Sequence, residues 1–304
     1  MIKSKLLTSF FQNYLKDKDI RIFRGKISYY IIFRLIRNFL ARDIIIKIYN
    51  FYVYGSTNKN KTSYFLLKKC EFGDFHEFNI IKKYSNKSKI LLLDCGCNYG
   101  FYSFYTASLS KENFVISIEA SKKTSNQFLR NLKLNNFNNI NFKNLAISNS
   151  DGDFISFNES QNDWESSQTH NNFKMFSVSK VKTIKIDTIM ENYNVDNFKV
   201  IIKLDVEGNE IKAIDGAKLF IKKKSPLIII EFSKFIFDIQ SNINYLKDFL
   251  IKYNYSIYDS NNNMINLNDV LIKLSNLKKN YNTIGNYYLV NNSEKNLKEF
   301  ISNE

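Results

Sequence analysis

Cysteine, proline, histidine and tryptophan are all scarce in this chain of 304 residues, which has three cysteines, two histidines, one proline and one tryptophan. Three cysteines are too few, and odd in number, for the disulfide scaffold of a small secreted protein. A chain of about 300 residues buries enough apolar surface to fold without such cross-links. With 44% hydrophobic and 24% charged residues, the composition is that of a globular protein, not a disordered or fibrous one.

A long uninterrupted apolar run is also missing. A membrane-spanning helix needs about 20 mostly apolar residues, and the best candidate, 27–40, is broken by Arg34 and Arg37. The first residues do not resemble a secretory signal, because Lys16 and Asp17 interrupt their apolar character. We therefore expect a soluble, cytoplasmic protein.

Acidic residues are in the minority, since 44 Lys and Arg against 29 Asp and Glu give a net charge of +15. Such a charge suits nucleic acid, an anionic membrane surface or an acidic substrate. The chain is also rich in Lys, Asn and Ile, as codon bias towards A and T produces, so much of the excess can be surface composition. The distribution is uneven, however: five of the six arginines lie in the first 42 residues.

Residues 1–65 are expected to form a helical N-terminal region. Within 26–54, apolar residues such as Ile32 and Leu35 recur at helical spacing with basic residues between them, which predicts one or two amphipathic helices. Three uses remain open: a cap packed on the following domain, a peripheral membrane contact through residues 26–54, and a dimer contact or substrate lid. The polar stretch 55–62 is the expected linker.

Residues 66–304 are expected to form one Rossmann-like α/β domain. Short apolar runs alternate with helical stretches, which is typical of βαβ units in an open, mostly parallel sheet. The expected strands cover residues 90–94, 114–119, 140–145, 178–186, 200–205 and 226–231. The expected helices cover 99–109, 121–135, 209–221 and a stretch from 242 onward, with an antiparallel edge pair at 255–258 and 286–290.

Four of the expected strands end in an acidic residue. These residues are Asp94, Glu119, Asp205 and Glu231. In an open α/β sheet, ligands bind outside the carboxyl ends of the strands, so the four carboxylates should converge on one crevice. The alternative is that each acid stabilises the N-terminus of the following helix, which explains one acid more easily than four.

The turn after the first of these strands has the pattern Asp94-Cys-Gly-Cys-Asn-Tyr-Gly, with Gly96, Asn98 and Gly100 in it. Glycines allow a tight turn and the close approach of a ligand to the backbone. Asp94 would repel a pyrophosphate but attract an ammonium or sulfonium group. Glu119 lies 25 residues further on, where an acid commonly binds ribose hydroxyls. The pair predicts a positively charged nucleoside, and S-adenosylmethionine fits.

A second block follows the strand at 200–205, where Asp205, Glu207 and Glu210 place three carboxylates within six residues. Crowded carboxylates raise one another's pKa, and Lys203 offsets this in part. Such a cluster could act as a general base, hold a metal ion or orient a hydroxyl. It could also only cap the helix that follows.

The two blocks, in this order, resemble the FkbM family of S-adenosylmethionine-dependent methyltransferases. The family's D-x-G-x-N-x-G motif is matched from Asp94 to Gly100, its acid after the second strand by Glu119, and its K-x-D-x-E-G-x-E block from Lys203 to Glu210. The stretch 144–148, which contains Ala146, is also similar. The resemblance covers a motif core of residues 88–235.

The resemblance implies a class I methyltransferase fold and S-adenosylmethionine as the cofactor. The matching positions are expected to bind it: Asp94, Gly96, Asn98, Gly100, Glu119 and Ala146. The implied reaction is O-methylation of a hydroxyl on a sugar or glycan, a lipid or a secondary metabolite.

A hydroxyl is a weak acid, so a general base must take its proton. The candidates, in order, are Glu207, Asp205 and His170. A divalent cation held by Asp205, Glu207 and Glu231 is an alternative, but we expect no metal.

Two other enzymes fit the same sheet. A dinucleotide-dependent oxidoreductase would carry G-x-G-x-x-G, whereas this turn has Asn98 in place of a glycine. A nucleic-acid methyltransferase fits the net charge, but the acidic stretch 205–208 would repel phosphates, so we do not expect a nucleic-acid partner. A non-catalytic membrane adaptor is a further alternative. Cys95 and Cys97 lack the second ligand pair of a zinc site, so we interpret them as structural.

Overall fold

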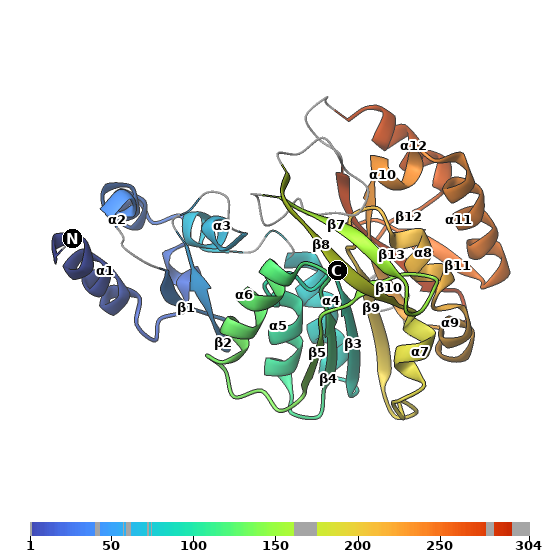
Figure 1. Ribbon diagram of the computed structural model, residues 1–304, viewed down its shortest axis with the longest axis horizontal. Coiled ribbons are helices and arrows are strands. Elements are labelled where there is room, and N and C mark those ends of the chain that lie inside the picture. The colour runs from blue at the N-terminus through green and yellow to red at the C-terminus, as the bar shows by residue number, and fades with distance from the viewer. Residues whose placement is uncertain are drawn as a thin grey trace.

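A computed structural model describes residues 2–39, 43–56, 58, 62–71, 73, 75–160, 175–277 and 283–293. An eight-stranded sheet forms its centre (Figure 1). From one edge to the other the strands are β12 (Met264–Ile265), β11 (Tyr255–Tyr258), β13 (Thr283–Asn291), β10 (Leu227–Ser233), β9 (Lys199–Leu204), β3 (Ile90–Cys95), β4 (Phe114–Ile118) and β5 (Ile140–Lys143).

The strand order confirms the expected Rossmann-like fold. Strands β5, β4, β3, β9 and β10 are parallel neighbours in that order. The chain first adds β4 and β5 on one side of β3, and it then crosses to the other side of β3 to add β9 and β10. The switch point therefore lies between β3 and β9, and in open α/β sheets ligands bind outside the carboxyl ends of the strands at such a point. Strand β13 runs antiparallel to both β10 and β11, which gives the antiparallel edge. The expected pair of 255–258 and 286–290 forms, although β12 is the outermost strand.

Both faces of the sheet are covered because successive residues of each strand point to opposite sides. In β3, Ile90 and Leu92 belong to one hydrophobic cluster, and Leu91 and Leu93 to the other. The first face packs against α4 (Phe75–Ser85), α5 (Phe101–Leu109) and α6 (Lys122–Leu132). The second packs against α7 (Ile186–Met190), α8 (Glu210–Asp215), α9 (Lys218–Lys224), α10 (Lys234–Phe237), α11 (Gln240–Lys252) and α12 (Leu267–Ser275). Strands buried on both faces are therefore continuous apolar runs, as the sequence showed.

The helix expected at 209–221 is interrupted by a tertiary contact. Gly216 lies so close to the backbone of Ser148 that a Cβ there would be 2.2 Å from the Ser148 carbonyl oxygen. The second half, α9, is then capped from another element, because the Asp187 carboxylate accepts the backbone N–H groups of Leu219 and Phe220. Two short helices, α8 and α9, replace the single predicted helix.

A small sheet lies outside the central one. It consists of β6 (Ala146–Ile147), β8 (Met175–Ile184) and β7 (Phe154–Ser160), with β7 antiparallel to β8. The segment 161–174, which joins β7 to β8, lies outside the described residues.

The N-terminal region contains α1 (Ile2–Leu15), α2 (Ile27–Ile36), β1 (Ile44–Ile48), β2 (Phe51–Gly55) and α3 (Thr62–Lys69), with short 3₁₀ turns at Ile20–Phe23 and Arg37–Phe39. The expected helix is present at α2. The helical prediction for the later part of 26–54 is wrong, because β1 and β2 form an antiparallel hairpin. Their β-branched and aromatic side chains are alternately buried and half-buried, which is the pattern of a strand with one covered face.

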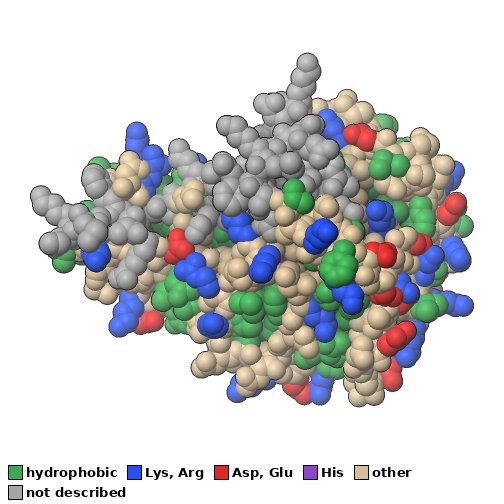
Figure 2. Space-filling view, in the orientation of Figure 1, with side chains coloured by type: hydrophobic (Ala, Val, Ile, Leu, Met, Phe, Trp, Pro, Cys, Tyr) green, Lys and Arg blue, Asp and Glu red, His purple; other side chains and the backbone are tan. Residues whose placement is uncertain are grey.

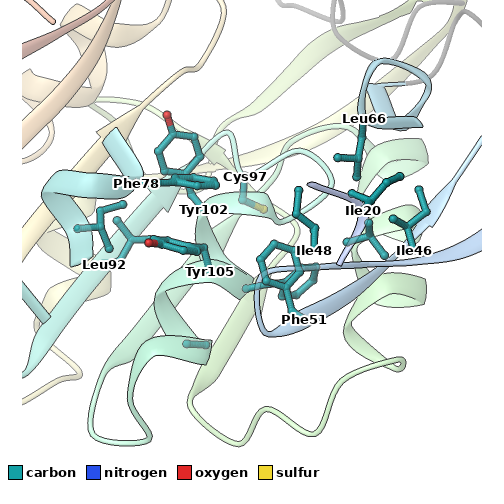
Figure 3. Close-up of a cluster of buried hydrophobic side chains, with 14 of the residues drawn as sticks. Ile20, Ile46, Ile48, Phe51, Leu66, Phe78, Leu92, Cys97, Tyr102 and Tyr105 are labelled. Atoms are coloured by element: carbon teal, nitrogen blue, oxygen red, sulfur yellow. The ribbon is translucent and has the colours of Figure 1, made fainter. Parts of the chain in front are cut away.

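This N-terminal region shares its core with the first face of the central sheet. Tyr49, at the hairpin turn, contacts both Phe78 of α4 and Tyr105 of α5, with ring centroids 5.7 and 4.8 Å apart. Figure 3 shows Ile48 and Phe51 of the hairpin in the same buried cluster as Tyr105. The region therefore packs on the domain as a structural cap, which was one of the three expected uses.

Two asparagines of the α6 segment replace a neighbouring strand for β2. The Asn135 side-chain amide accepts the Tyr52 N–H at 2.8 Å and donates to the Tyr52 carbonyl at 2.8 Å. One turn earlier, Asn131 Oδ1 accepts the Tyr54 N–H at 2.9 Å. Asn131 lies in α6 and Asn135 follows the end of this helix, and their amides together hold β2 against the domain.

We predict that Asn135→Ala lowers the free energy of unfolding by about 1–2 kcal/mol, because two backbone groups of Tyr52 lose their partner. Urea unfolding followed by circular dichroism measures this. Asn136→Ala, at the exposed neighbouring position, is the control and should change stability by less than about 0.5 kcal/mol. Equal effects at the two positions would contradict the role assigned to Asn135.

Candidate active site

The loop between β3 and α5 is fastened to the end of β4. The backbone N–H groups of Gly96 and Cys97 both donate to the Ile118 carbonyl oxygen, at 2.9 and 3.0 Å. Asn98 has a left-handed backbone with φ of 49°, and its N–H donates to Glu119 Oε2 at 2.9 Å. The first motif and the acid after the second strand therefore form one unit.

Glu119 is buried and accepts a second backbone N–H, from Ser121, at 2.8 Å on its other oxygen. Burial raises the pKa of this carboxyl to about 7; the two backbone hydrogen bonds offset part of this rise, and the nearby charges of Asp205 and Asp94 add a smaller one. A carboxylate can accept about four hydrogen bonds. Glu119 thus has acceptor capacity left for the two hydroxyls of a ribose.

Asp94 lies deeper than the sequence suggested. Its carboxylate is almost fully buried, and its Oδ2 accepts the Ser103 hydroxyl of α5 at 2.5 Å. The Ser103 hydroxyl is also 2.7 Å from that of Ser117 in β4. Burial raises the pKa of Asp94 to about 6, partly offset by Ser103 and Lys203. Asp94 therefore joins β3 to α5 and places negative charge beneath the loop.

The two glycines of the motif are required by protein atoms. A Cβ on Gly96, whose φ is +79°, would lie 1.8 Å from the Asp205 carbonyl oxygen. A Cβ on Gly100, whose φ is +89°, would lie 2.7 Å from the rings of Phe104 and Phe128. We expected the glycines to admit a ligand to the backbone. At Gly96 the space is instead taken by the β9–α8 loop, so the two motif loops are pressed together.

In the β9–α8 loop, one of the three carboxylates supports the turn itself. Glu210 is buried and accepts the backbone N–H groups of Val206 and Gly208, both at 3.0 Å. Burial raises its pKa to about 7. Both donors precede α8, so these hydrogen bonds stabilise the turn that leads into the helix and do not cap the helix N–H groups.

Asp205 is paired with the one buried lysine of the site. Lys203 Nζ is 3.0 Å from Asp205 Oδ2, and the lysine side chain is only 2% exposed whereas that of Asp205 is 38% exposed. The ammonium also lies 5.3 Å from the centre of the Tyr102 ring. A buried ammonium needs such partners, and the contact with Lys203 holds the Asp205 side chain in place.

Glu207 and Glu231 are the two remaining acids of the cluster. Glu207 has a left-handed backbone with φ of 53°, a conformation that costs about 1 kcal/mol or more for a residue with a Cβ and is common at functional sites. Burial and the charges of Asp205 and Glu231 raise the pKa of Glu207 well above its ordinary value. Burial and the Asp205 charge raise the pKa of Glu231 to about 8.

The carboxyl groups expected to converge do so. The charge of Asp205 raises the pKa of five other carboxyls, which requires all of them to lie near it: Asp94, Glu119, Glu207, Glu210 and Glu231. They come from the carboxyl ends of β3, β4, β9 and β10 (Figure 1). Their roles in binding and catalysis remain predictions.

Two predicted site residues stand apart from this cluster. Ala146 lies in β6, where it is buried and packs with Ala120, just after Glu119. Asn144, two residues earlier, donates to the carbonyl oxygens of Glu119 and Ala120 at 2.7 and 3.1 Å. The stretch around Ala146 is therefore tied to the Glu119 side of the crevice. His170 lies outside the described residues.

Sequence reasoning missed three residues that support the acids. Ser103 donates to Asp94, Ser117 is hydrogen-bonded to Ser103, and the Tyr102 ring lies beside the Lys203 ammonium. The available signal was a serine inside an otherwise apolar helix and another inside an apolar strand, since a buried hydroxyl needs a partner.

Cys95 and Cys97 are buried, and burial raises the pKa of both thiols, so neither is present as a reactive thiolate. Within the part of the chain that the structure describes, no group of three or more His, Cys, Asp and Glu is arranged to hold a metal ion. In that same part, every helix is too short or too polar to cross a bilayer.

A parallel sheet with this strand order, an antiparallel β13, and buried acids at the carboxyl ends of β3 and β4 defines a class I, S-adenosylmethionine-dependent methyltransferase domain. Comparison with known proteins names the family: the Methyltransferase FkbM domain matches residues 94–257, just over half of the chain. The chain belongs to the FkbM methyltransferase family. This membership decides against the dinucleotide-dependent oxidoreductase.

Solved structures with similar folds are distant in sequence. An FkbM methyltransferase from Methylobacillus flagellatus KT is 17% identical with a TM-score of 0.39; the match covers 74% of this chain but only 52% of that one. Precorrin-6y C5,15-methyltransferase from Geobacter metallireducens GS-15 is 11% identical, with a TM-score of 0.37 and coverage of 71% and 85%. M. jannaschii TYW2, solved with AdoMet, is 12% identical, with a TM-score of 0.36 and coverage of 81% and 84%. A search of curated proteins gave no match.

The contact between the two motif loops gives a direct prediction for Gly96→Ala. We expect a loss of about 3 kcal/mol or more in the free energy of unfolding, from a left-handed φ and from the clash with the Asp205 carbonyl.

Two other glycines separate these causes. Gly285 has φ of +92° and open space around its Cβ position, and Gly73 has open space without a positive φ. Denaturant unfolding should show a loss of about 1 kcal/mol for Gly285→Ala and almost none for Gly73→Ala. If Gly96→Ala is no worse than Gly285→Ala, the loops do not meet as described.

Proposed function

We propose that this protein uses S-adenosylmethionine to methylate a hydroxyl oxygen of a small-molecule acceptor, such as a sugar or glycan, a lipid or a secondary metabolite. The observation that carries the proposal is Glu207: a carboxyl with a strongly raised pKa at the open carboxyl end of β9, next to the ion-paired Asp205. The pKa of a hydroxyl is far above neutrality, so its reaction needs a base whose affinity for a proton is greater than that of an ordinary carboxylate.

The acids at the carboxyl ends of β3 and β4 fit the cofactor. Glu119 is placed to accept hydroxyl hydrogen bonds, and Asp94 adds negative charge below the loop. When bound, S-adenosylmethionine supplies a methyl group on a positively charged sulfur. Negative charge around that position favours a cationic ligand, and in the absence of such a ligand the same carboxyls repel one another, which contributes to their raised pKa values.

Within this proposal Glu207 accepts the hydroxyl proton of the acceptor. Glu231 lies near enough to raise the pKa of Glu207, so the pair tends to hold a proton near neutral pH. Asp205 is the weaker candidate because its carboxylate is already bound to Lys203. A nucleic-acid acceptor is disfavoured because the exposed part of the site is acidic and would repel phosphates.

The test is Glu207→Gln, which keeps the shape of the side chain but cannot take up a proton. We expect the affinity for S-adenosylhomocysteine, measured by calorimetry, to change by less than about threefold, and turnover to fall by about 10²–10⁴. Turnover is measured as transfer of labelled methyl to panels of monosaccharides, glycerolipids and phenols, with transfer RNA as the nucleic-acid comparison.

Glu112→Gln is the control, because Glu112 is an exposed acid paired with Lys89 at 2.6 Å and far along the chain from the β9 loop. It should leave both quantities unchanged. If Glu207→Gln lowers the affinity for S-adenosylhomocysteine as much as it lowers turnover, the role of Glu207 is structural and not that of a base. Methyl transfer to RNA alone would overturn the proposed acceptor.

The pH dependence is a further readout on the same proteins. Because Glu207 must be ionised to act, and because its pKa is raised, kcat/KM of the wild type should fall with decreasing pH well above the pH 4–5 range in which an ordinary glutamate titrates.

A further inference from the structure

The N-terminal region exposes more large hydrophobic side chains than any other part of the described chain. Sixteen such side chains are exposed among the described residues, and seven of them lie within the first 39 residues. They belong to α1, to the 3₁₀ turn after it and to α2. In Figure 1 this region forms one end of the molecule, away from the sheet edge that carries β11 and β12. Nothing in the proposed methyl transfer requires this exposure.

Helix α2 is apolar on two opposite sides. Tyr29 and Phe33 point inward and stack with ring centroids 6.1 Å apart. Ile27, Ile31 and Leu35 follow one another at intervals of four residues on the outward side, and they are 75%, 53% and 66% exposed. A helix that is apolar all round is normally buried on all sides. In α2 the side that carries Tyr29 and Phe33 is buried, and the opposite apolar side is exposed.

Arg34 lies on the same outward side, since it is seven residues from Ile27 and exposed. We define the α2 outer face as Ile27, Ile31, Arg34 and Leu35. Lys26, also exposed, immediately precedes it. Figure 2 shows hydrophobic and basic side chains next to one another at this end of the molecule.

The charge around this face is strongly positive. Residues 1–39 contain nine Lys and Arg against two Asp. Two of the arginines are already paired, Arg21 with Asp19 at 2.6 Å and Arg24 with Glu71 at 2.9 Å. An apolar stripe with basic residues beside it is the pattern of a helix that lies in the interface of a bilayer containing anionic lipids.

We propose that the α2 outer face docks on a membrane surface that contains anionic lipids, with Ile27, Ile31 and Leu35 inserted among the acyl chains and Arg34 at the level of the headgroups. The contact goes beyond the proposed methyl transfer and does not depend on it. The proposed membrane contact covers fewer residues than the range 26–54 expected from the sequence. The apolar side chains of the β1–β2 hairpin are buried or half-buried in the domain and do not take part.

A second copy of the chain is a poorer occupant of this face. Two copies would bring like charges together, which is unfavourable. A stable protein interface also buries at least about 1,200 Å², and three aliphatic side chains supply only a small part of that area. A bilayer offers both negative charge and an apolar interior.

The test is co-sedimentation of the full chain with vesicles of phosphatidylcholine alone and of phosphatidylcholine mixed with phosphatidylserine. We expect binding to the mixed vesicles that weakens as salt is added, because the charges on the surface are screened. Ile31→Glu together with Leu35→Glu should lower the partition coefficient by tenfold or more, since two inserted side chains are lost. Arg34→Ala should lower it by about fivefold.

Ile251→Glu together with Ile272→Glu is the matched control. These residues are 73% and 58% exposed on α11 and α12, and the pair changes the net charge by the same amount. It should lower binding by much less than the α2 pair. Circular dichroism and S-adenosylhomocysteine binding, which should be unchanged in both pairs, show that the fold and the cofactor site are intact.

Three outcomes would overturn the proposal. The first is a wild type that sediments with neither kind of vesicle. The second is an equal loss of binding for the two pairs, which would indicate general attraction of a basic protein to a negative surface. A dimer seen by light scattering, and abolished by the α2 pair, would assign the face to self-association instead. None of these outcomes bears on the methyltransferase assignment, which is tested without vesicles.

Discussion

Mutual repulsion among buried carboxyl groups is the constraint on which the site depends. The charge of Asp205 raises the pKa of five other acids at the ends of four strands, and burial of those five removes much of the water that would otherwise screen them. One buried ammonium, that of Lys203, is the positive charge at their centre, with Asp205 at 3.0 Å. Partial protonation of these acids lowers the net negative charge of the site, and a cationic ligand would stabilise their ionised form.

The backbone arrangement makes this crowding achievable. Glycine at position 96 lets the β3–α5 loop lie directly on the Asp205 carbonyl. Glu210 satisfies the N–H groups of the β9–α8 turn, and Glu119 satisfies those of Asn98 and Ser121. The same carboxylates that give the site its charge therefore also hold its loops. For this reason a substitution such as Glu119→Ala would remove both a proposed ligand contact and two hydrogen bonds that hold the loop, whereas Glu207→Gln changes only the proposed proton acceptor.

Much of the central sheet follows from the sequence because its strands are short apolar runs that end in an acid, and that pattern is local. The hairpin at β1 and β2 could not be separated from a helix in the same way. Its isoleucines and tyrosines suit either structure until the hairpin packs against Tyr105 and α6. The break between α8 and α9 is also tertiary, since it arises where Gly216 meets Ser148. At the site, the acids were identifiable from their positions, but only the structure shows that Glu210 accepts the backbone N–H groups of the turn, which leaves Glu207 as the proposed base.

The central claim is that the carboxyls of the free site hold protons near neutral pH and give them up to a cationic methyl donor. Calorimetry of S-adenosylmethionine binding at about pH 7, in buffers with different ionisation enthalpies, measures this directly. With pKa values of about 6 for Asp94, about 7 for Glu119 and about 8 for Glu231, the account predicts net proton release on binding and an affinity that rises between about pH 6 and pH 8. Binding without proton release, and with the same affinity across this range, would contradict it.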